Sequence, residues 1–335
     1  MPERRAAFLI GPASVRPGTK QETELPIAKQ VTGSPISLPV LVIHGSEDGP
    51  TAWINAAVHG DEINGVEVIR RLIGKIDPKR LNGTLLLVPV VNVPGFITGD
   101  RYLPDRRDLN RSFPGSKRGS LASRIAALFM SEIVGRCTVG IDLHTGSDHR
   151  TNLPQIRADL DDPQTLDLAT AFAAPVLMHA SIRDGSLRQA GTEAGATVLL
   201  FEGGEAWRFD EDTIRTGTDG VMNVLARIGA YDHPVPPPPT LLSCRSSRWV
   251  RARRSGIAQL SVATGTMVSK GQTIGRIHDS FGRQLSQINA PIEGVVLGLN
   301  LDPLVNQGDA LVHIGEVHET IEPTNPNPTD AGMTT

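Results

Sequence analysis

The stretch "AWINAAVHGDEINGVEVIRRLI", residues 52–73, decides the fold because an apolar strand gives way to an amphipathic helix within it. Ala52 to Val58 is short, apolar and uncharged, as expected of a buried strand, and apolar residues at positions 63, 66, 69 and 73 then follow the period of a helix. His59 and Glu62 therefore stand three residues apart at a strand-to-helix corner. In open α/β sheets, such corners at the carboxyl ends of strands are where ligands bind.

The alternation of strand and helix continues to about residue 230. The strand-like runs are "TLLLVPVVN" (84–92), "TVGIDLH" (138–144), "LPQIRA" (153–158) and "ATVLLFE" (196–202), and the helix-like runs are residues 120–135, 162–174 and 210–229. This order predicts an α/β fold with a mainly parallel, helix-covered sheet. The first 45 residues contain "LPVLVIHG" and many turn residues, which predicts a hairpin at the sheet edge.

Four consecutive prolines in "HPVPPPPTLL", residues 233–242, mark a boundary, because neither a helix nor a central strand tolerates them. We expect a catalytic domain over residues 1–236 and an all-β module over residues 241–316, where short alternating segments are separated by glycine turns. "VSKGQTI" and "VNQGDAL" repeat the same apolar and glycine spacing there, which predicts two similar hairpin halves. Residues 317–335 are polar and proline-rich and are expected to form a disordered tail.

The composition excludes several classes of function. With a net charge of −3 and no polybasic segment, the chain has no electrostatic footprint for nucleic acid or for an anionic membrane. Its two cysteines form no disulfide framework and no CxxC metal site. The apolar run near the start is too short for a signal peptide, and no stretch reaches the roughly 18 apolar residues of a membrane span. We therefore expect a cytoplasmic protein that acts on a small molecule, with homo-oligomerisation left open.

His59 and Glu62 lie on one face of a first helical turn, and a catalytic zinc site needs three such ligands with a fourth position left open. His144, at the end of "GIDLH", is the candidate for the third ligand, and Asp142 points to the same side of that strand and could orient it. A lone HxxE pattern often arises by chance. The prediction of a metal site therefore rests on the fact that His59 and His144 both stand at the carboxyl ends of predicted strands. The other histidines stand in uninformative contexts and are interpreted as surface or core residues: His44, His149, His179, His233, His278, His313 and His318.

"DRYLPDRRDLNRSFPG", residues 100–115, places four arginines where a loop would overhang the predicted metal. Arginine is suited to a bidentate grip on a carboxylate, so Arg111 with Asn110, and also Arg101, are candidates for substrate binding. Arg106 and Arg107 are more typical of a solvated face.

Glu202 ends the apolar run "VLLFE", so that its carboxylate is expected at the same rim as His59 and His144. A carboxylate in that place could act as general base, an effect worth roughly 10² to 10⁴ in rate. Glu205, three residues further along, is the competing candidate.

Together these stretches resemble the succinylglutamate desuccinylase/aspartoacylase family, a branch of the zinc carboxypeptidase-like fold. "VHGDE" (58–62) and "DLHTG" (142–146) resemble its two zinc motifs, "DLNR" (108–111) its substrate-carboxylate motif, and "FEGG" (201–204) the strand end that bears its catalytic glutamate. The resemblance covers residues from about 40 to 230.

This resemblance implies a zinc-dependent amidohydrolase that removes the acyl group from a small N-acyl amino acid. It implies that one zinc ion per chain is bound by His59, Glu62 and His144. Asn110 and Arg111 would then bind the substrate carboxylate, while Glu202 activates water and Arg101 polarises the scissile carbonyl. The acyl group and the amino acid stay open, because no second anion clamp is evident in the sequence.

The C-terminal part, residues 251–315, resembles the β module of these enzymes and is similar to a biotinyl or lipoyl domain. The turn that would bear the carrier lysine reads "HDSFGRQ" and contains no lysine, so no prosthetic group is expected. We expect the module to have a structural or access-controlling role instead. Two alternative functions stay open: a metallocarboxypeptidase that cuts peptides, and a non-catalytic module that binds carboxylate ligands.

Overall fold

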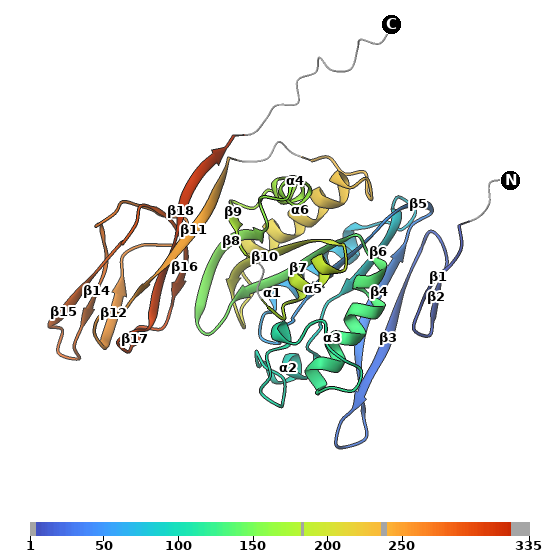
Figure 1. Ribbon diagram of the computed structural model, residues 1–335, viewed down its shortest axis with the longest axis horizontal. Coiled ribbons are helices and arrows are strands. Elements are labelled where there is room, and N and C mark those ends of the chain that lie inside the picture. The colour runs from blue at the N-terminus through green and yellow to red at the C-terminus, as the bar shows by residue number, and fades with distance from the viewer. Residues whose placement is uncertain (1–4, 182–183, 236–239, 323–335) are drawn as a thin grey trace, which may run out of the picture.

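The computed structural model describes residues 5–181, 184–235 and 240–322. Within these ranges one large mixed sheet runs through the molecule, and helices cover it on both faces (Figure 1). The prolines at positions 236–239, on which the predicted domain boundary rests, lie outside the described residues.

The large sheet has twelve strands in the described part of the chain. Their spatial order is β13 (Met267–Val268), β16 (Gly294–Asn300), β18 (Ala310–Ile321), β11 (Leu241–Arg251), β9 (Val176–His179), β8 (Arg150–Ala158), β10 (Thr197–Glu205), β7 (Val139–Gly146), β5 (Glu47–Ala56), β6 (Asn82–Val88), β4 (Pro35–His44) and β3 (Thr19–Lys29). The pairs β10/β7, β7/β5 and β5/β6 are parallel, as the βα alternation predicted. The run "LPQIRA" departs from that pattern, because β8 is antiparallel to β10 and makes the sheet mixed.

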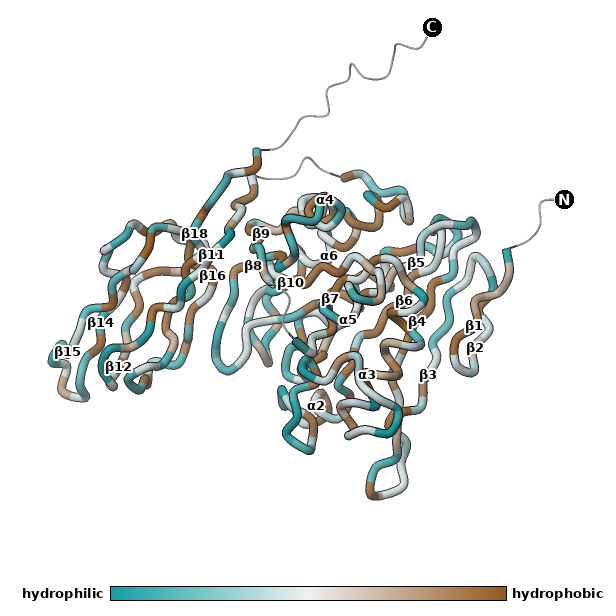
Figure 2. The backbone as a smooth tube through the Cα atoms, viewed as in Figure 1, coloured by the Kyte–Doolittle hydropathy of each residue, from teal (hydrophilic) through white to brown (hydrophobic). Residues whose placement is uncertain are grey.

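Helices pack on both faces of the sheet because successive strand residues alternate between two cores. Trp53 belongs to the core under α3 (Leu121–Glu132) and α5 (Leu187–Glu193), whereas its neighbour Ile54 belongs to the core under the helices on the other face. That second group comprises α1 (Asn64–Lys75), α4 (Pro163–Phe172) and α6 (Glu211–Arg227). The apolar brown of the inner strands and the teal of the outer loops show this layering in Figure 2.

The predicted helices begin where the sequence supplies caps. The side chains of Ser120, Asp162 and Asp210 accept hydrogen bonds from backbone N–H groups at the starts of α3, α4 and α6. Three short helices were not predicted: α2 (Val93–Thr98), η1 (Leu109–Arg111) and α5. The helix predicted over residues 120–135 is divided into α3 and the single turn η2 (Val134–Arg136). In the part of the chain that the structure describes, no helix is long and apolar enough to cross a membrane.

The predicted N-terminal hairpin is confirmed. β3 and β4 pair antiparallel, and β3 forms one edge of the large sheet. A second small hairpin, β1 (Phe8–Ile10) and β2 (Ala13–Val15), packs into the core next to α3. The N-terminal part therefore closes one end of the sheet (Figure 1).

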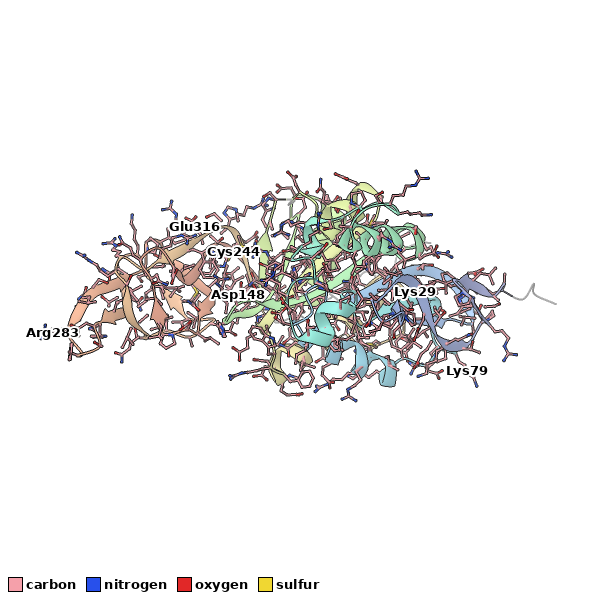
Figure 3. All side chains as sticks on the ribbon, turned by 90° about the horizontal axis from the view of Figure 1, so that it is seen from below. Lys29, Lys79, Asp148, Cys244, Arg283 and Glu316 are labelled. Atoms are coloured by element: carbon pink, nitrogen blue, oxygen red, sulfur yellow. The ribbon has the colours of Figure 1, made fainter. Side chains whose placement is uncertain are left out.

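The C-terminal module contains a separate four-stranded sheet, made of β15 (Gln284–Asn289), β14 (Thr273–His278), β12 (Gly256–Leu260) and β17 (Leu304–Val305). Its remaining strands extend the large sheet, since β11 pairs with β9 and β16 pairs with β8. The two repeat segments occupy equivalent positions: Val268 and Val305 are buried, and Gly271 and Gly308 have positive φ in the following turns. In Figure 3 the labelled Asp148 and Cys244 lie near the junction, and Arg283 lies at the far end of the module.

One boundary expected from the sequence needs correction. Strand β18 continues to Ile321, so residues 317–321 are strand rather than disordered tail. Their pairing with the start of β11 explains the difference, because strand hydrogen bonds order a polar segment that has no hydrophobic pattern of its own. The rest of the expected tail, residues 323–335, lies outside the described residues.

Candidate metal and substrate site

The corner that carries His59 and Glu62 is shaped by a close approach between two backbones. A Cβ atom on Gly60 would lie 2.0 Å from the carbonyl carbon of Gly95 in α2, so only glycine fits there. The loop between β5 and α1 therefore lies flat against α2 and is almost fully buried. His59 and Glu62 stand in a turn of this loop, because α1 begins only at Asn64, and not in the first helical turn as predicted. This packing fixes the directions in which His59 and Glu62 point.

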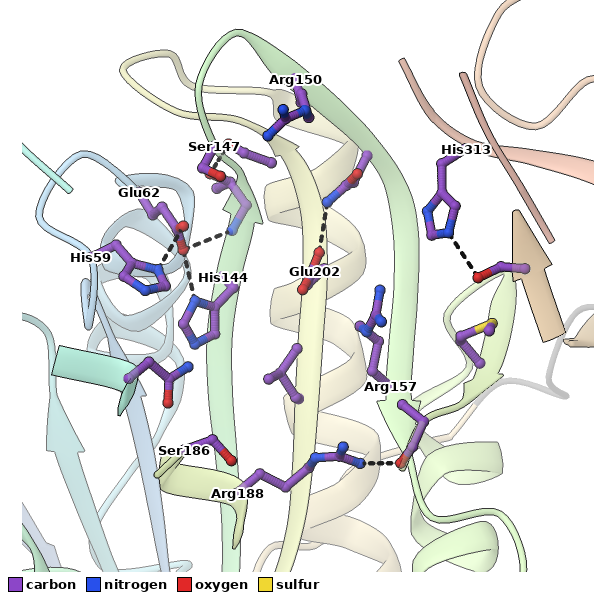
Figure 4. A pocket seen from close by; sticks show the side chains of 18 of the residues that line it. His59, Glu62, His144, Ser147, Arg150, Arg157, Ser186, Arg188, Glu202 and His313 are labelled. Atoms are coloured by element: carbon purple, nitrogen blue, oxygen red, sulfur yellow. Dashed lines mark hydrogen bonds and ion pairs between the residues drawn. The ribbon is translucent and has the colours of Figure 1, made fainter. Parts of the chain in front are cut away.

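His59, Glu62 and His144 converge. One ligand atom from each lies within 4.8 Å of the others, and all three side chains are buried. The Nδ1 atom of His59 lies 2.8 Å from Glu62 Oε1, and the Nδ1 atom of His144 lies 2.7 Å from Glu62 Oε2 (Figure 4). The convergence follows from the topology, because β5 and β7 are parallel neighbours and end at the same edge of the sheet.

The second ring nitrogen of each histidine faces a carboxylate. His144 Nε2 lies 2.9 Å from Asp142 Oδ2, as the spacing of these residues predicted, and Asn55 in turn donates to Asp142 Oδ1 at 2.6 Å. His59 Nε2 lies 3.2 Å from Asp108 Oδ1. Asp108 was not singled out from the sequence, although it is the first residue of the "DLNR" motif. A carboxylate on the outer nitrogen leaves Nδ1 with the lone pair that a metal ion needs.

The charges at these three side chains fit a divalent cation. Burial alone would lower the pKa of both histidines, but the carboxylate of Glu62, with Asp108 at His59 and Asp142 at His144, outweighs burial and raises the pKa of each. Burial would likewise raise the pKa of Glu62, but the two histidines lower it. The carboxylates thus favour a positive charge at the two histidines. A metal cation bound at the Nδ1 atoms could supply that charge in place of protons. Two nitrogens and a carboxylate oxygen are a donor set that zinc accepts.

The predicted arginine loop also reaches the site. Arg101 lies 3.2 Å from Glu62 Oε1 and 3.2 Å from Asp108 Oδ2. Asn110 is buried in η1 and accepts a hydrogen bond from the backbone N–H of Leu187 at 2.9 Å. Arg101, Asn110 and Arg111 all line one cavity together with the three converging side chains.

The remaining candidate residues differ in whether they line this cavity. Glu202 lines the same cavity, and Asn152 donates to its Oε2 at 2.6 Å. Glu205 does not line it and pairs instead with Arg208 at 3.2 Å. Arg106 and Arg107 are exposed side chains outside the cavity lining. The placement of Glu202 follows from the pairing of β10 with β7, in which it lies directly beside His144.

The cavity has a volume of about 760 Å³ and extends well beyond the three converging side chains. Its lining includes several arginines that the sequence did not single out: Arg150, Arg157, Arg188 and Arg245. His179 and His313, which the sequence did not distinguish from other surface or core residues, also line it. Their position could not be anticipated, because strand β9 and the C-terminal module reach the cavity only through long-range pairing.

The C-terminal module forms the wall of the cavity on the side opposite His59 and Glu62 (Figure 4). Trp249 of β11 stacks on His313 of β18 with ring centroids 4.6 Å apart, and the guanidinium of Arg150 lies 5.6 Å from the centroid of the Trp249 ring. Nε2 of His313 also lies 2.8 Å from the hydroxyl of Ser247. The C-terminal module therefore contributes side chains to the lining of the cavity.

His313 is expected to make stability depend on pH. Burial, aided by the charge of Arg157, lowers the pKa of His313 to about 4. Since an unfolded histidine titrates near 6.5, the unfolded chain takes up the proton first, and stability is lost as the pH falls from 6.5 toward 4. Between pH 7.5 and pH 5 this loss is about 2 kcal/mol in the free energy of unfolding. Chemical denaturation of the wild type and of His313→Gln at both pH values measures it, and equal losses in the two proteins would contradict the assignment.

Comparison with known proteins agrees with the geometry. Residues 48–228, more than half of the chain, match the family described as Succinylglutamate desuccinylase/Aspartoacylase catalytic domain. The chain is 29% identical over 313 residues to an N-alpha-acetyl-L-2,4-diaminobutyric acid deacetylase of Halomonas elongata, an alignment that covers 89% of this chain and 91% of the relative. It is 35% identical over 183 residues to a succinylglutamate desuccinylase of Burkholderia lata, covering 48% of this chain and 50% of that relative.

Two solved structures share the fold over most of their length. A succinylglutamate desuccinylase/aspartoacylase from Rhodobacter sphaeroides has a TM-score of 0.80 at 27% identity, covering 90% of this chain and 97% of that one. The product-bound ectoine utilization protein EutE (DoeB) from Ruegeria pomeroyi has a TM-score of 0.81 at 25% identity, covering 90% and 96%. The resemblance inferred from the four motifs is confirmed, and the chain belongs to the succinylglutamate desuccinylase/aspartoacylase family.

Proposed function

We propose that this protein is a zinc-dependent hydrolase that removes the acyl group from a small N-acyl amino acid. The observation that carries the proposal is the placement of His59, Glu62 and His144 in one cavity with Glu202. The names of the relatives, a deacetylase and a desuccinylase of amino acids, support the same reaction class.

The side chains divide the chemistry among them. His59, Glu62 and His144 would hold the zinc ion, which would supply a Lewis acid for the carbonyl oxygen of the substrate and would make water a better nucleophile near neutral pH. Glu202 takes a proton from the attacking water and returns it to the departing amine. Arg101, whose guanidinium lies against Glu62, donates hydrogen bonds to the negative charge that develops on the carbonyl oxygen.

Asn110 and Arg111 hold the substrate carboxylate. The amide oxygen of Asn110 already accepts from Leu187, so its NH₂ group is the part that can donate to a ligand. Arg111 adds the charge and the fork of donors that suit a carboxylate. Fixing the substrate at one end aligns its amide bond with Glu202, which turns binding energy into rate.

The charges of the cavity favour a substrate with more than one carboxylate. Among the described residues that line it, Glu62 and Glu202 are the only acidic side chains, and both already have roles. Arg157 lines the cavity and lies opposite Leu200 in the strand pairing, and no carboxylate among the described residues forms an ion pair with it. A second carboxylate on the acyl group or on the amino acid side chain would find a partner there, whereas a second amino group would not.

We expect the zinc-loaded protein to release amine from N-succinyl and N-acetyl derivatives of acidic amino acids. Their kcat/KM is expected to exceed that of N-acetyl-diaminobutyrate at least about tenfold, the value of one charge-assisted hydrogen bond. Amine release is measured across a panel of N-acetyl, N-succinyl and N-formyl amino acids and dipeptides, with a chelated control. Preference for the diaminobutyrate derivative would overturn the charge argument and leave the reaction class standing.

The same panel separates the alternative functions. Turnover of dipeptides but not of N-acyl amino acids would establish a metallocarboxypeptidase. Binding of carboxylates without turnover of any substrate, despite one zinc per chain, would indicate a non-catalytic binding protein.

A further inference from the structure

The side chain of Asn152 connects Glu202 to the C-terminal module. Its Nδ2 atom donates to Glu202 Oε2 at 2.6 Å, the contact that a dashed line marks above Glu202 in Figure 4. A carboxylate can only accept hydrogen bonds, so the NH₂ group of the amide must face Glu202. The amide oxygen Oδ1 therefore points to the other side.

Gly298 of strand β16 lies on that other side. In the pairing of β16 with β8, Gly298 is directly opposite Asn152. A Cβ atom on Gly298 would lie 2.6 Å from Asn152 Oδ1 and 3.0 Å from the carbonyl oxygen of Thr151. The φ angle of Gly298 is not in the left-handed region, so glycine is needed here for space and not for backbone conformation. Because Gly298 has no side chain, the C-terminal module leaves enough space for the amide group of Asn152.

We propose that Asn152 is a positioning residue for Glu202 and that the C-terminal module sets this position through Gly298. The inference rests on the proposed role of Glu202 as general base. The hydrogen bond to Oε2 holds the carboxylate in one orientation and leaves Oε1 to exchange the proton. A side chain at position 298 would push the amide away, because the tip of Asn152 is the flexible part of the contact.

A purely structural role of Asn152 makes a different prediction. The backbone of this segment is held by strand pairing on both sides, to Gly204 in β10 and to Gly298 in β16. A further hydrogen bond runs from the backbone N–H of Leu301 to the carbonyl of His149 at 2.7 Å. These bonds do not use the side chain of Asn152, so removing it leaves the strand in place and acts on Glu202.

A double-mutant cycle tests the inference. Asn152→Ala and Gly298→Ala are each expected to lower kcat roughly 10- to 100-fold with little change in KM, because the base is misplaced while the substrate still binds. The double variant is expected to be no slower than Asn152→Ala, since the added methyl group of Gly298→Ala acts chiefly on that side chain, its closest neighbour. Multiplicative effects, or a kcat for Asn152→Ala within threefold of the wild type, would overturn the inference.

Gly315→Ala is the matched control. This glycine lies in strand β18 of the same module, and a Cβ atom there would press on the side chain of Leu297 at 2.8 Å. Its substitution therefore strains the module without touching Asn152, and kcat is expected to stay near the wild-type value. A loss of kcat equal to that of Gly298→Ala would show that general damage to the module is the cause.

The contact also has a readout that does not need turnover. The side-chain amide resonances of Asn152 are expected to shift in Glu202→Ala and in Gly298→Ala, but not in Gly315→Ala. If the wild type turns over no substrate while these shifts are seen, the proposed function fails and the contact stands. If the wild type is active but the resonances do not move, the contact fails and the function stands.

Discussion

Replacing Glu202 with Gln is expected to lower kcat by about 10² to 10⁴, the usual contribution of a general base. KM and the zinc content are expected to change little, because the substitution keeps the shape of the side chain and Glu202 is not one of the three converging ligands. Gln can still accept the hydrogen bond from Asn152, but it cannot take a proton from water. Steady-state kinetics with the best substrate of the panel, together with metal analysis, measures both quantities.

Glu205→Gln is the control for this experiment. Glu205 pairs with Arg208 and stays outside the cavity lining, so its substitution is expected to leave kcat within about threefold of the wild type. The reverse result, an inactive Glu205 variant and an active Glu202 variant, would assign the base to Glu205.

Replacing Glu62 with Gln is expected to lower zinc affinity at least about 100-fold and to reduce activity to background. Glu62 lies between the two histidine Nδ1 atoms, and its negative charge raises the pKa of both, so a neutral side chain removes a ligand and the attraction for a cation. Zinc content after dialysis against a competing chelator is the measurement. Asp142→Asn is a graded comparison, with an expected loss of roughly 10- to 100-fold, because it disturbs only the orientation of His144.

Asp159→Asn controls for a different metal position. Asp159, Asp161 and His179 also bring ligand atoms within 4.8 Å of one another, but both aspartates are exposed and Asp161 pairs with Arg245. Zinc binding is therefore expected to survive Asp159→Asn. If Glu62→Gln kept one tightly bound zinc and Asp159→Asn lost it, the metal would be assigned to Asp159, Asp161 and His179 instead.

The part of the site that depends on strand ends could be predicted from the sequence. His59, His144 and Glu202 each follow a short apolar run, and parallel neighbouring strands bring such ends to one edge. Local patterns are sufficient for this inference, because the burial of each strand and the residue at which its apolar run ends are both encoded within a few residues of each side chain.

The part that depends on distant pairing could not be predicted. The run "LPQIRA" has the pattern of a buried strand in either direction. Only its pairing with β10 shows that it runs antiparallel and brings Arg157 to the cavity. Asp108 lies in a loop without regular periodicity, and His313 lies in a strand whose pattern does not show what it packs against. The partners of these side chains, His59 and Ser247, are about fifty or more residues away in the chain. The contact of Asn152 with Gly298 has the same origin, since nothing near either residue in the sequence indicates the other.

The large sheet has a consequence for how this protein unfolds. Because β11 continues the sheet beside β9, and β16 beside β8, hydrogen bonds cross the place where the prolines suggest a boundary. Detaching the C-terminal strands would leave backbone N–H and C=O groups of β8 and β9 without partners, which is costly for groups that are buried. We therefore expect the two parts to unfold as one cooperative unit, so that a substitution that weakens a C-terminal strand also lowers the temperature at which the region around His59, Glu62 and His144 unfolds. The change in composition at the prolines is therefore not expected to divide the chain into two parts that unfold independently.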